Sequence, residues 1–127
     1  MKTHTLKYKL YLSSKNNSPN IEIIINPSVE YDNFIAASII NISYIPLIKN
    51  YIDEVIENLT KVVAGELNYY EFGEEWGWFD CEKDYTIFGF LDKEICQLNT
   101  DELYEMLCKW VIFFKRYYIE GTLLPQD

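Results

Sequence analysis

The sequence predicts an α+β fold, with an antiparallel sheet of about five to six strands and two long amphipathic helices, residues 46–64 and 100–119, packed on it. Three observations support this prediction. The N-terminal residues alternate between apolar and polar types, two later segments carry apolar residues at helical spacing, and strands precede and follow the first helix. No linker or internal repeat divides the 127 residues, so we expect a single domain, residues 1–127.

The predicted N-terminal strands depend on alternation and on β-branched residues. Apolar and polar side chains alternate over residues 6–12, as in a half-buried strand. Polar turn residues 13–20 separate this strand from the isoleucine-rich run 21–25, so the two should form a hairpin. Residues 31–44 are compatible with a buried strand or with the approach to a helix, and their isoleucines favour a third strand.

The helix over residues 46–64 begins at Pro46, which suits a first turn because its missing N–H is not needed there. Gly65 follows at the position of a left-handed C-cap. The apolar residues lie three and four positions apart and form one stripe: Ile48, Ile52, Val55, Leu59 and Val62.

The helix over residues 100–119 is capped by Asn99 or Thr100, and Asp101 and Glu102 suit the dipole of its first turn. We expect Gly121 to end it. Its apolar stripe consists of Leu103, Leu107, Trp110, Phe114 and Tyr117.

The net charge of −9 restricts the choice of partner. Nucleic acids and anionic membranes are bound through clusters of Lys and Arg, so the charge argues against both, whereas a basic protein would be attracted. Three widely spaced cysteines are typical of reduced thiols, and the N-terminus contains no continuous apolar signal region. We therefore expect a cytoplasmic protein.

The usual catalytic residue sets do not occur in the sequence. His4 is the single histidine, so a nucleophile–histidine pair would have to use that residue. No paired metal-ligand motif and no glycine-rich phosphate loop is present. We expect no catalytic residues, no metal and no cofactor, and hence a protein that is not an enzyme.

Residues 66–84, the acidic segment, concentrate charge and aromatic side chains. The segment holds seven acids and one lysine, a net charge of −6, within a stretch (66–91) predicted to form two or three strands broken by Gly73, Gly77 and Gly89. Trp76 and Trp78 would share a face if this run were extended. The predicted partner-binding residues are Glu71, Glu74, Glu75, Trp76, Trp78, Asp80, Glu82 and Asp84.

The acidic segment has other interpretations. Trp76 and Trp78 could be core residues, with the acids as their solvated counterparts. A small carboxylate-dependent hydrolase could use Glu74, Glu75 or Asp80 beside a tryptophan. A self-associating scaffold would bury the aromatic face in a symmetric homodimer.

Three motifs add a family resemblance: Val62-Val63-Ala64-Gly65-Glu66, Tyr70-Glu71-Phe72-Gly73, and Leu98-Asn99-Thr100-Asp101-Glu102-Leu103 followed by Trp110. In this order the chain resembles small bacterial immunity proteins encoded beside polymorphic toxins, including those of contact-dependent growth inhibition. The resemblance implies a cytosolic protein that binds and neutralises a cognate toxin domain, often a nuclease with a basic cleft. It implies no shared contact residues, because most matching positions are helix caps and core residues.

Overall fold

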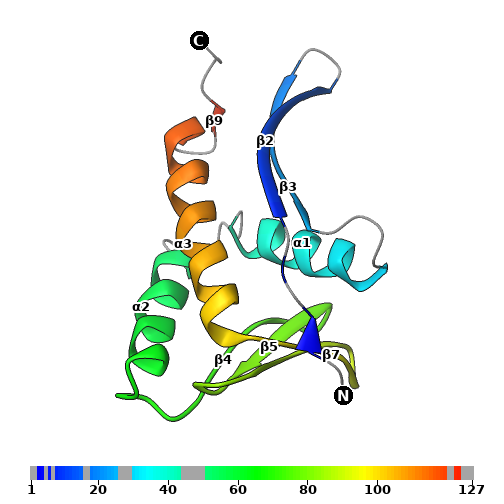
Figure 1. Cartoon of the computed structure of the whole chain (residues 1–127). Helices are drawn as coiled ribbons and strands as arrows, with labels where there is room; N and C mark the ends of the chain where they lie inside the picture. The colour runs from blue at the N-terminus through cyan, green and yellow to red at the C-terminus, as the bar shows by residue number, and fades with distance from the viewer. Residues whose placement is uncertain are drawn as a thin grey trace.

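The computed structural model shows an α+β protein whose helices lie on one face of a sheet (Figure 1). It describes the backbone of residues 3–4, 6, 8–15, 18–25, 30–43, 51–119 and 122–123, and the side chains of residues 6, 8, 10, 34–43 and 51–116. The α+β class predicted from the sequence is confirmed.

The main sheet consists of four antiparallel strands with one short parallel strand at its edge. Its order is β1-β7-β6-β5-β4, which leaves β4 at the other edge. The strands are β4 Tyr70–Glu74, β5 Gly77–Cys81, β6 Thr86–Phe90, β7 Lys93–Leu98 and the parallel β1 Thr3–His4. The predicted strands between residues 66 and 91 are therefore present as β4, β5 and β6. Gly77 begins β5 directly after a turn, and the pairing register shifts between Phe88 and Gly89, whereas Gly73 lies inside β4 and does not break it.

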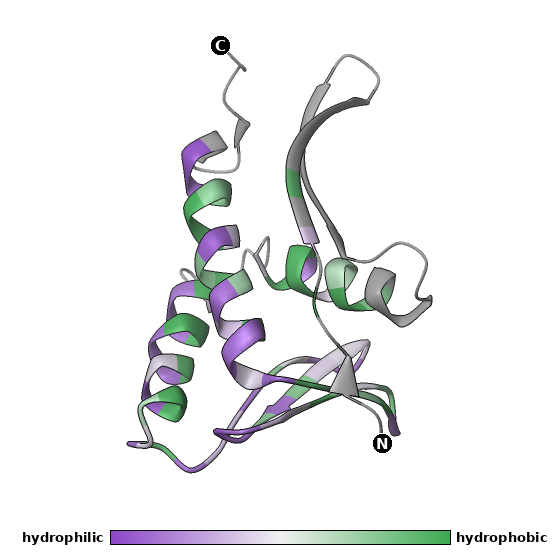
Figure 2. Ribbon diagram, viewed as in Figure 1, coloured by the Kyte–Doolittle hydropathy of each residue, from purple (hydrophilic) through white to green (hydrophobic). Residues whose placement is uncertain are grey.

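Among the described residues three helices, not two, cover the sheet: α1 Glu30–Ser43, α2 Tyr51–Val63 and α3 Thr100–Tyr117. The apolar stripe of α2 faces α3 and the sheet (Figure 2). The core between the helices and the sheet includes Phe79, Phe88 and Trp110, each fully buried. Trp110 is thus the core tryptophan of this protein.

The prediction of a third strand over residues 31–44 is wrong, because the described residues 30–43 form α1. Ile35, Ile39 and Ile42 lie four and three positions apart and are all buried. Their common face packs towards the sheet and α2. Burial of this stripe outweighs the modest preference of β-branched residues for strands.

The predicted hairpin is present as β2 Tyr8–Lys15 paired antiparallel with β3 Ser18–Ile25. Its strands include residues expected to be turn, and it forms a two-stranded sheet of its own beside α1 and α3. A second short pair, β8 Tyr118–Ile119 and β9 Thr122–Leu123, follows α3. The predicted sheet of five to six antiparallel strands is therefore divided among smaller units.

The ends of α2 and α3 confirm most of the predicted capping. Gly65 has a φ of 81°, and the amides of Gly65 and Glu66 donate to the carbonyls of Val62 and Lys61, which is the Schellman arrangement. At α3, the Asn99 side chain accepts the Glu102 amide at 3.1 Å. The predicted helix over residues 100–119 is two residues too long, because α3 ends at Tyr117 and Tyr118–Ile119 form β8. Pro46, Ile48 and Gly121 lie outside the described residues.

Within the part of the chain that is described, no helix combines the length and apolar character needed to cross a bilayer.

Candidate functional site

The β4–β5 hairpin presents two chemically different faces. Phe72 and Phe79 point towards the helices and stack with ring centroids 4.6 Å apart. Glu71, Trp78 and Asp80 occupy the alternate positions, so they lie on the opposite side of the sheet, which the helices leave uncovered. Part of the acidic segment is therefore exposed by strand alternation.

We call this uncovered side the outer face and define it by Tyr69, Glu71, Trp78, Asp80 and Glu94. Glu71 and Asp80 are direct partners in the β4–β5 register. Glu94 pairs with Gly89 in the next strands and acts on Asp80 electrostatically. Like charges opposite one another in a sheet destabilise it, so this arrangement is costly for the isolated protein.

Trp78 is held flat on the outer face by its neighbours. Its indole N–H donates to the Leu91 carbonyl at 2.7 Å. Its ring covers Gly89, where an added Cβ would lie 1.9 Å from the indole. Glycine at position 89 is therefore required for this packing, and Trp78 forms a fixed, half-buried platform.

Asp80 carries the most unusual environment on this face. Its Oδ1 is buried and has no hydrogen-bond partner among the described residues. Burial raises the pKa of Asp80, the neighbouring Tyr69 hydroxyl lowers it, and the carboxylates of Glu71 and Glu94 raise it. The Tyr69 hydroxyl donates to Glu71 Oε2 at 3.0 Å. Burial and the carboxylates of Glu71 and Asp80 also raise the pKa of Tyr69, so it remains a neutral donor.

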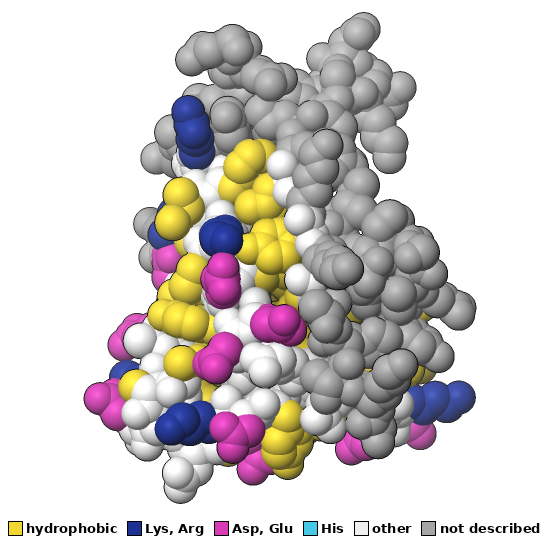
Figure 3. Space-filling model, in the orientation of Figure 1, with side chains coloured by type: hydrophobic (Ala, Val, Ile, Leu, Met, Phe, Trp, Pro, Cys, Tyr) yellow, Lys and Arg dark blue, Asp and Glu magenta, His cyan; other side chains and the backbone are white. Residues whose placement is uncertain are grey.

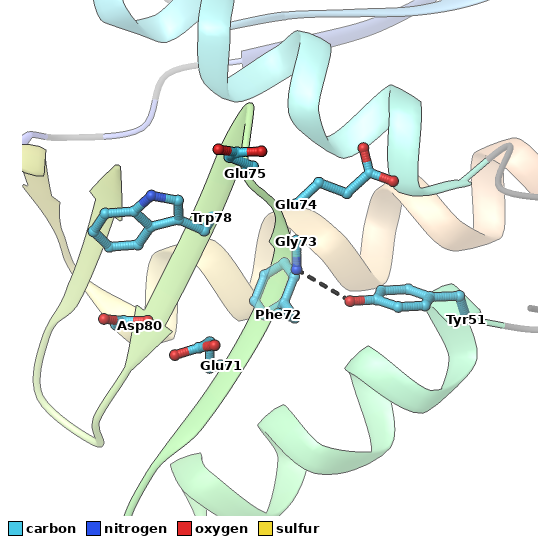
Figure 4. A pocket seen from close by; sticks show the side chains of 8 residues that line it. All are labelled: Tyr51, Glu71, Phe72, Gly73, Glu74, Glu75, Trp78 and Asp80. Carbon is cyan, nitrogen blue, oxygen red and sulfur yellow. Dashed lines mark hydrogen bonds between the residues drawn. The ribbon is translucent and has the colours of Figure 1, made fainter. Parts of the chain in front are cut away.

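An open depression of about 620 Å³ follows the free edge of β4 (Figure 4). At its centre the Gly73 amide donates to the Tyr51 hydroxyl of α2 at 3.1 Å. The lining is rich in carboxylates and consists of Tyr51, Glu71, Phe72, Gly73, Glu74, Glu75, Trp78 and Asp80. The depression joins the outer face to the β4–β5 turn.

Trp76 lies apart from Trp78, because the condition for a shared face, an extended run, is not met. The turn occupies Glu75 and Trp76, and the run is therefore not extended between the two tryptophans. Trp76 is 63% exposed and contacts Phe90, with centroids 5.5 Å apart. It lies with Glu74 beside α1, at the end of the sheet. Neither Trp76 nor Trp78 belongs to the core cluster.

Glu82 and Asp84 lie in the loop between β5 and β6, at the other end of β5 from the Trp76 turn. A five-residue strand spans roughly 16 Å, so one small contact patch would not include both ends. Glu82 also has a structural role, because its carbonyl accepts the Thr100 hydroxyl at 2.6 Å. The eight predicted residues therefore divide into an outer-face group, a turn group and this loop pair.

The acids of the acidic segment are not included in the ion pairs seen among the described residues. Those pairs join Lys61 to Glu57, Lys109 to Glu105 and Lys115 to Asp53. Acidic side chains predominate in the lower half of the molecule in Figure 3, over the sheet and the adjoining helix ends. The described acidic surface is thus available to an external base.

Several residues of these surfaces were not identified from the sequence. Tyr51 and Glu94 are far from the acidic segment in sequence, and their proximity depends on strand pairing and helix packing. Phe34 and Asn41 were placed in a strand, whereas α1 brings them to Trp76. The helical spacing of the apolar residues over 34–42 would have predicted a helix that carries both residues.

The chain matches no protein-family model, no curated protein and no solved structure.

Proposed function

We propose that this protein is a cytoplasmic immunity protein that binds and neutralises a cognate toxin domain, a nuclease, through its acidic outer face. The observation that carries the proposal is the arrangement of Glu71 and Asp80 beside Trp78. These carboxylates lie opposite one another without a basic partner in the described ion pairs, next to a fixed aromatic platform.

The charge of this face suits a nuclease. A nuclease must attract phosphates, so its substrate cleft is rich in Lys and Arg. A carboxylate-lined surface competes for the same cationic groups and increases the rate of encounter by electrostatic steering. The carboxylates of Glu71 and Asp80, which line the open depression, would accept charge-assisted hydrogen bonds from a Lys or Arg of the toxin.

Trp78 supplies the apolar part of the interface. Tryptophan residues are frequent at the centres of protein interfaces, because a large rigid ring loses little conformational entropy on binding. The hydrogen bond to Leu91 and the contact with Gly89 orient this ring before the partner arrives. The resemblance to immunity proteins encoded beside toxins supports the same partner class.

A hydrolase is less well supported. Paired acid–base catalysis requires two carboxylates with different roles in a site that excludes water. The depression at the edge of β4 is open to solvent. Its carboxylates are better suited to contact a folded partner.

The proposal can be tested with the protein encoded immediately upstream. We expect its C-terminal domain to be toxic when expressed alone, to be harmless when co-expressed with this chain, and to form a 1:1 complex with it. Calorimetric titration and growth assays measure these results. An upstream product that neither binds nor inhibits growth would contradict the proposed function.

The contribution of the outer face is measured with two variants that change the net charge equally. Glu71→Lys combined with Asp80→Asn should slow association by about tenfold or more at low salt. Glu54→Lys combined with Glu66→Gln changes exposed acids away from the outer face, and its association rate should stay within about twofold of wild type. Equal rates for both variants would rule out a specific role for the outer face.

A further inference from the structure

A notch lies between α1 and the β4–β5 turn, on the helix side of the sheet. Its volume is about 320 Å³, and three aromatic side chains line it: Phe34, Trp76 and Phe90. Phe34 and Phe90 have ring centroids 5.8 Å apart, and Trp76 contacts Phe90 at 5.5 Å in a T-shaped arrangement. Phe34 is 46% exposed and Trp76 63% exposed, so these rings leave much of their surface to solvent.

A positioned carboxylate borders the same notch. The Asn41 side chain donates to Glu74 Oε2 at 2.9 Å and so links α1 to the end of β4. A carboxylate has about four acceptor positions, and one bond from Asn41 leaves capacity for another donor. The notch therefore combines exposed aromatic area with an oriented negative charge.

We propose that the notch binds one arginine side chain of the toxin domain, with the guanidinium on Trp76 and its N–H groups donating to Glu74. This inference rests on the proposed function for the identity of the partner, and it adds a second contact point beside the outer face. A guanidinium is planar, stacks on indole rings and pairs with a carboxylate in a fork geometry.

The chemistry of the notch favours arginine over other occupants. An apolar side chain would bury the Glu74 carboxylate with the single hydrogen bond from Asn41, which leaves its negative charge uncompensated and is unfavourable. A lysine could pair with Glu74 but has no flat surface to cover the indole. A second copy of this chain would bring the exposed Glu74 of one notch towards that of another, and like charges oppose that contact.

The test uses the full-length ¹⁵N-labelled protein and two short probes, acetyl-Gly-Arg-Gly-amide and acetyl-Gly-Lys-Gly-amide. The indole N–H signal of Trp76 is assigned with Trp76→Phe. We expect the arginine probe to shift the Trp76 indole and Asn41 amide signals along a saturating curve, with a Kd on the order of millimolar. The lysine probe should bind at least about threefold more weakly.

Two matched variants test the contribution of the carboxylate. Glu74→Gln should weaken arginine binding at least about threefold, whereas Glu66→Gln, which removes an exposed charge elsewhere, should leave it unchanged. Equal effects of both variants, or equal binding of both probes, would overturn the proposal. Probe-induced shifts confined to the Trp78 indole signal would also overturn it. A homodimer seen in sedimentation experiments and dissociated by Trp76→Ala would do the same.

This measurement is independent of toxin neutralisation. If the probes fail while the upstream toxin is still neutralised, the arginine site is wrong and the proposed function stands. If the probes bind but no toxin is neutralised, the arginine site is correct as a site and the proposed partner is wrong.

Discussion

At the scale of single residues, the outer face combines a fixed ring with a poorly satisfied carboxylate. The Leu91 backbone is central to this arrangement, because its amide donates to the Glu75 carbonyl at 2.7 Å and its carbonyl accepts the Trp78 indole. Leu91 has a φ of 56°, in the left-handed region that is unfavourable for a leucine. Two hydrogen bonds hold this conformation and thereby fix both the Trp78 ring and the neighbouring turn.

Asp80 allows a residue-scale prediction about stability. Its pKa is raised in the folded protein, mainly by burial, so the folded state binds this proton more tightly than the unfolded chain. The charged carboxylate therefore lowers stability above the folded pKa. That penalty disappears as the pH falls through the folded pKa towards the unfolded value. We expect Asp80→Asn to raise the free energy of unfolding at neutral pH by up to about 1 kcal/mol, with a smaller gain near pH 4.

Urea unfolding of wild type and Asp80→Asn at several pH values measures this difference. Glu54→Gln, which neutralises an exposed acid on α2, serves as the control and should show no comparable gain. A loss of stability in Asp80→Asn at neutral pH would mean that the charged form of Asp80 makes a favourable contact. Asn at this position should also weaken toxin binding, since it gives up the charge proposed to attract the partner.

At the scale of helices and strands, the sequence predicted α2 and α3 well, because their stripes and caps are local signals. Gly65 caps the C-terminus of α2 and Asn99 caps the N-terminus of α3, at the predicted positions. Residues 31–44 were predicted wrongly, since their β-branched composition favoured a strand and the helical spacing of Ile35, Ile39 and Ile42 was given less weight. Tertiary burial decides between these two signals, and it is not visible in a single sequence.

The candidate site was predictable only in part, because some of its features are local in the sequence and others depend on tertiary structure. The concentration of acids and aromatic residues is a property of the sequence, and the alternation of β4 places Phe72 inward and Glu71 outward. The division of the tryptophans was not predictable, because it depends on the turn falling at Glu75 and Trp76. One residue more or less in a turn changes the face on which the next side chain lies.

Gly77 provides a prediction at the scale of elements. A Cβ at this position would lie 1.8 Å from Ser38 Oγ, so glycine permits the close approach of α1 to β5. Its φ is not positive, unlike that of Gly65 and Gly73, and the expected effect is therefore steric. Gly77→Ala should lower the free energy of unfolding by about 1–3 kcal/mol.

A double-mutant cycle checks this explanation. Ser38→Gly alone should cost about 1 kcal/mol, because it places glycine in a helix. In the Ser38→Gly background, Gly77→Ala should cost little more, since the clashing side chain is gone. Additive losses in urea unfolding would show that crowding against α1 is not the cause.

At the scale of the whole molecule, charge is unevenly distributed. The chain has a net charge of −9, and the acidic segment contributes −6 of it. The ion pairs seen among the described residues lie on α2 and α3, while the outer face sets carboxylates opposite one another. One side of the sheet therefore packs against the helices, and the other carries repulsion between acids that an external Lys or Arg would relieve.

This distribution predicts how salt affects stability. Raising NaCl from about 10 mM to about 200 mM shortens the Debye length to less than about 10 Å and screens repulsion between exposed acids. Wild type should gain about 1 kcal/mol in the free energy of unfolding over this range, measured by urea titration. Glu71→Gln combined with Asp80→Asn should reduce the gain, because it removes facing charges. Glu57→Gln combined with Glu105→Gln neutralises two acids paired with lysines and should not reduce it. A wild type whose stability falls with salt would show that attraction, not repulsion, dominates its surface.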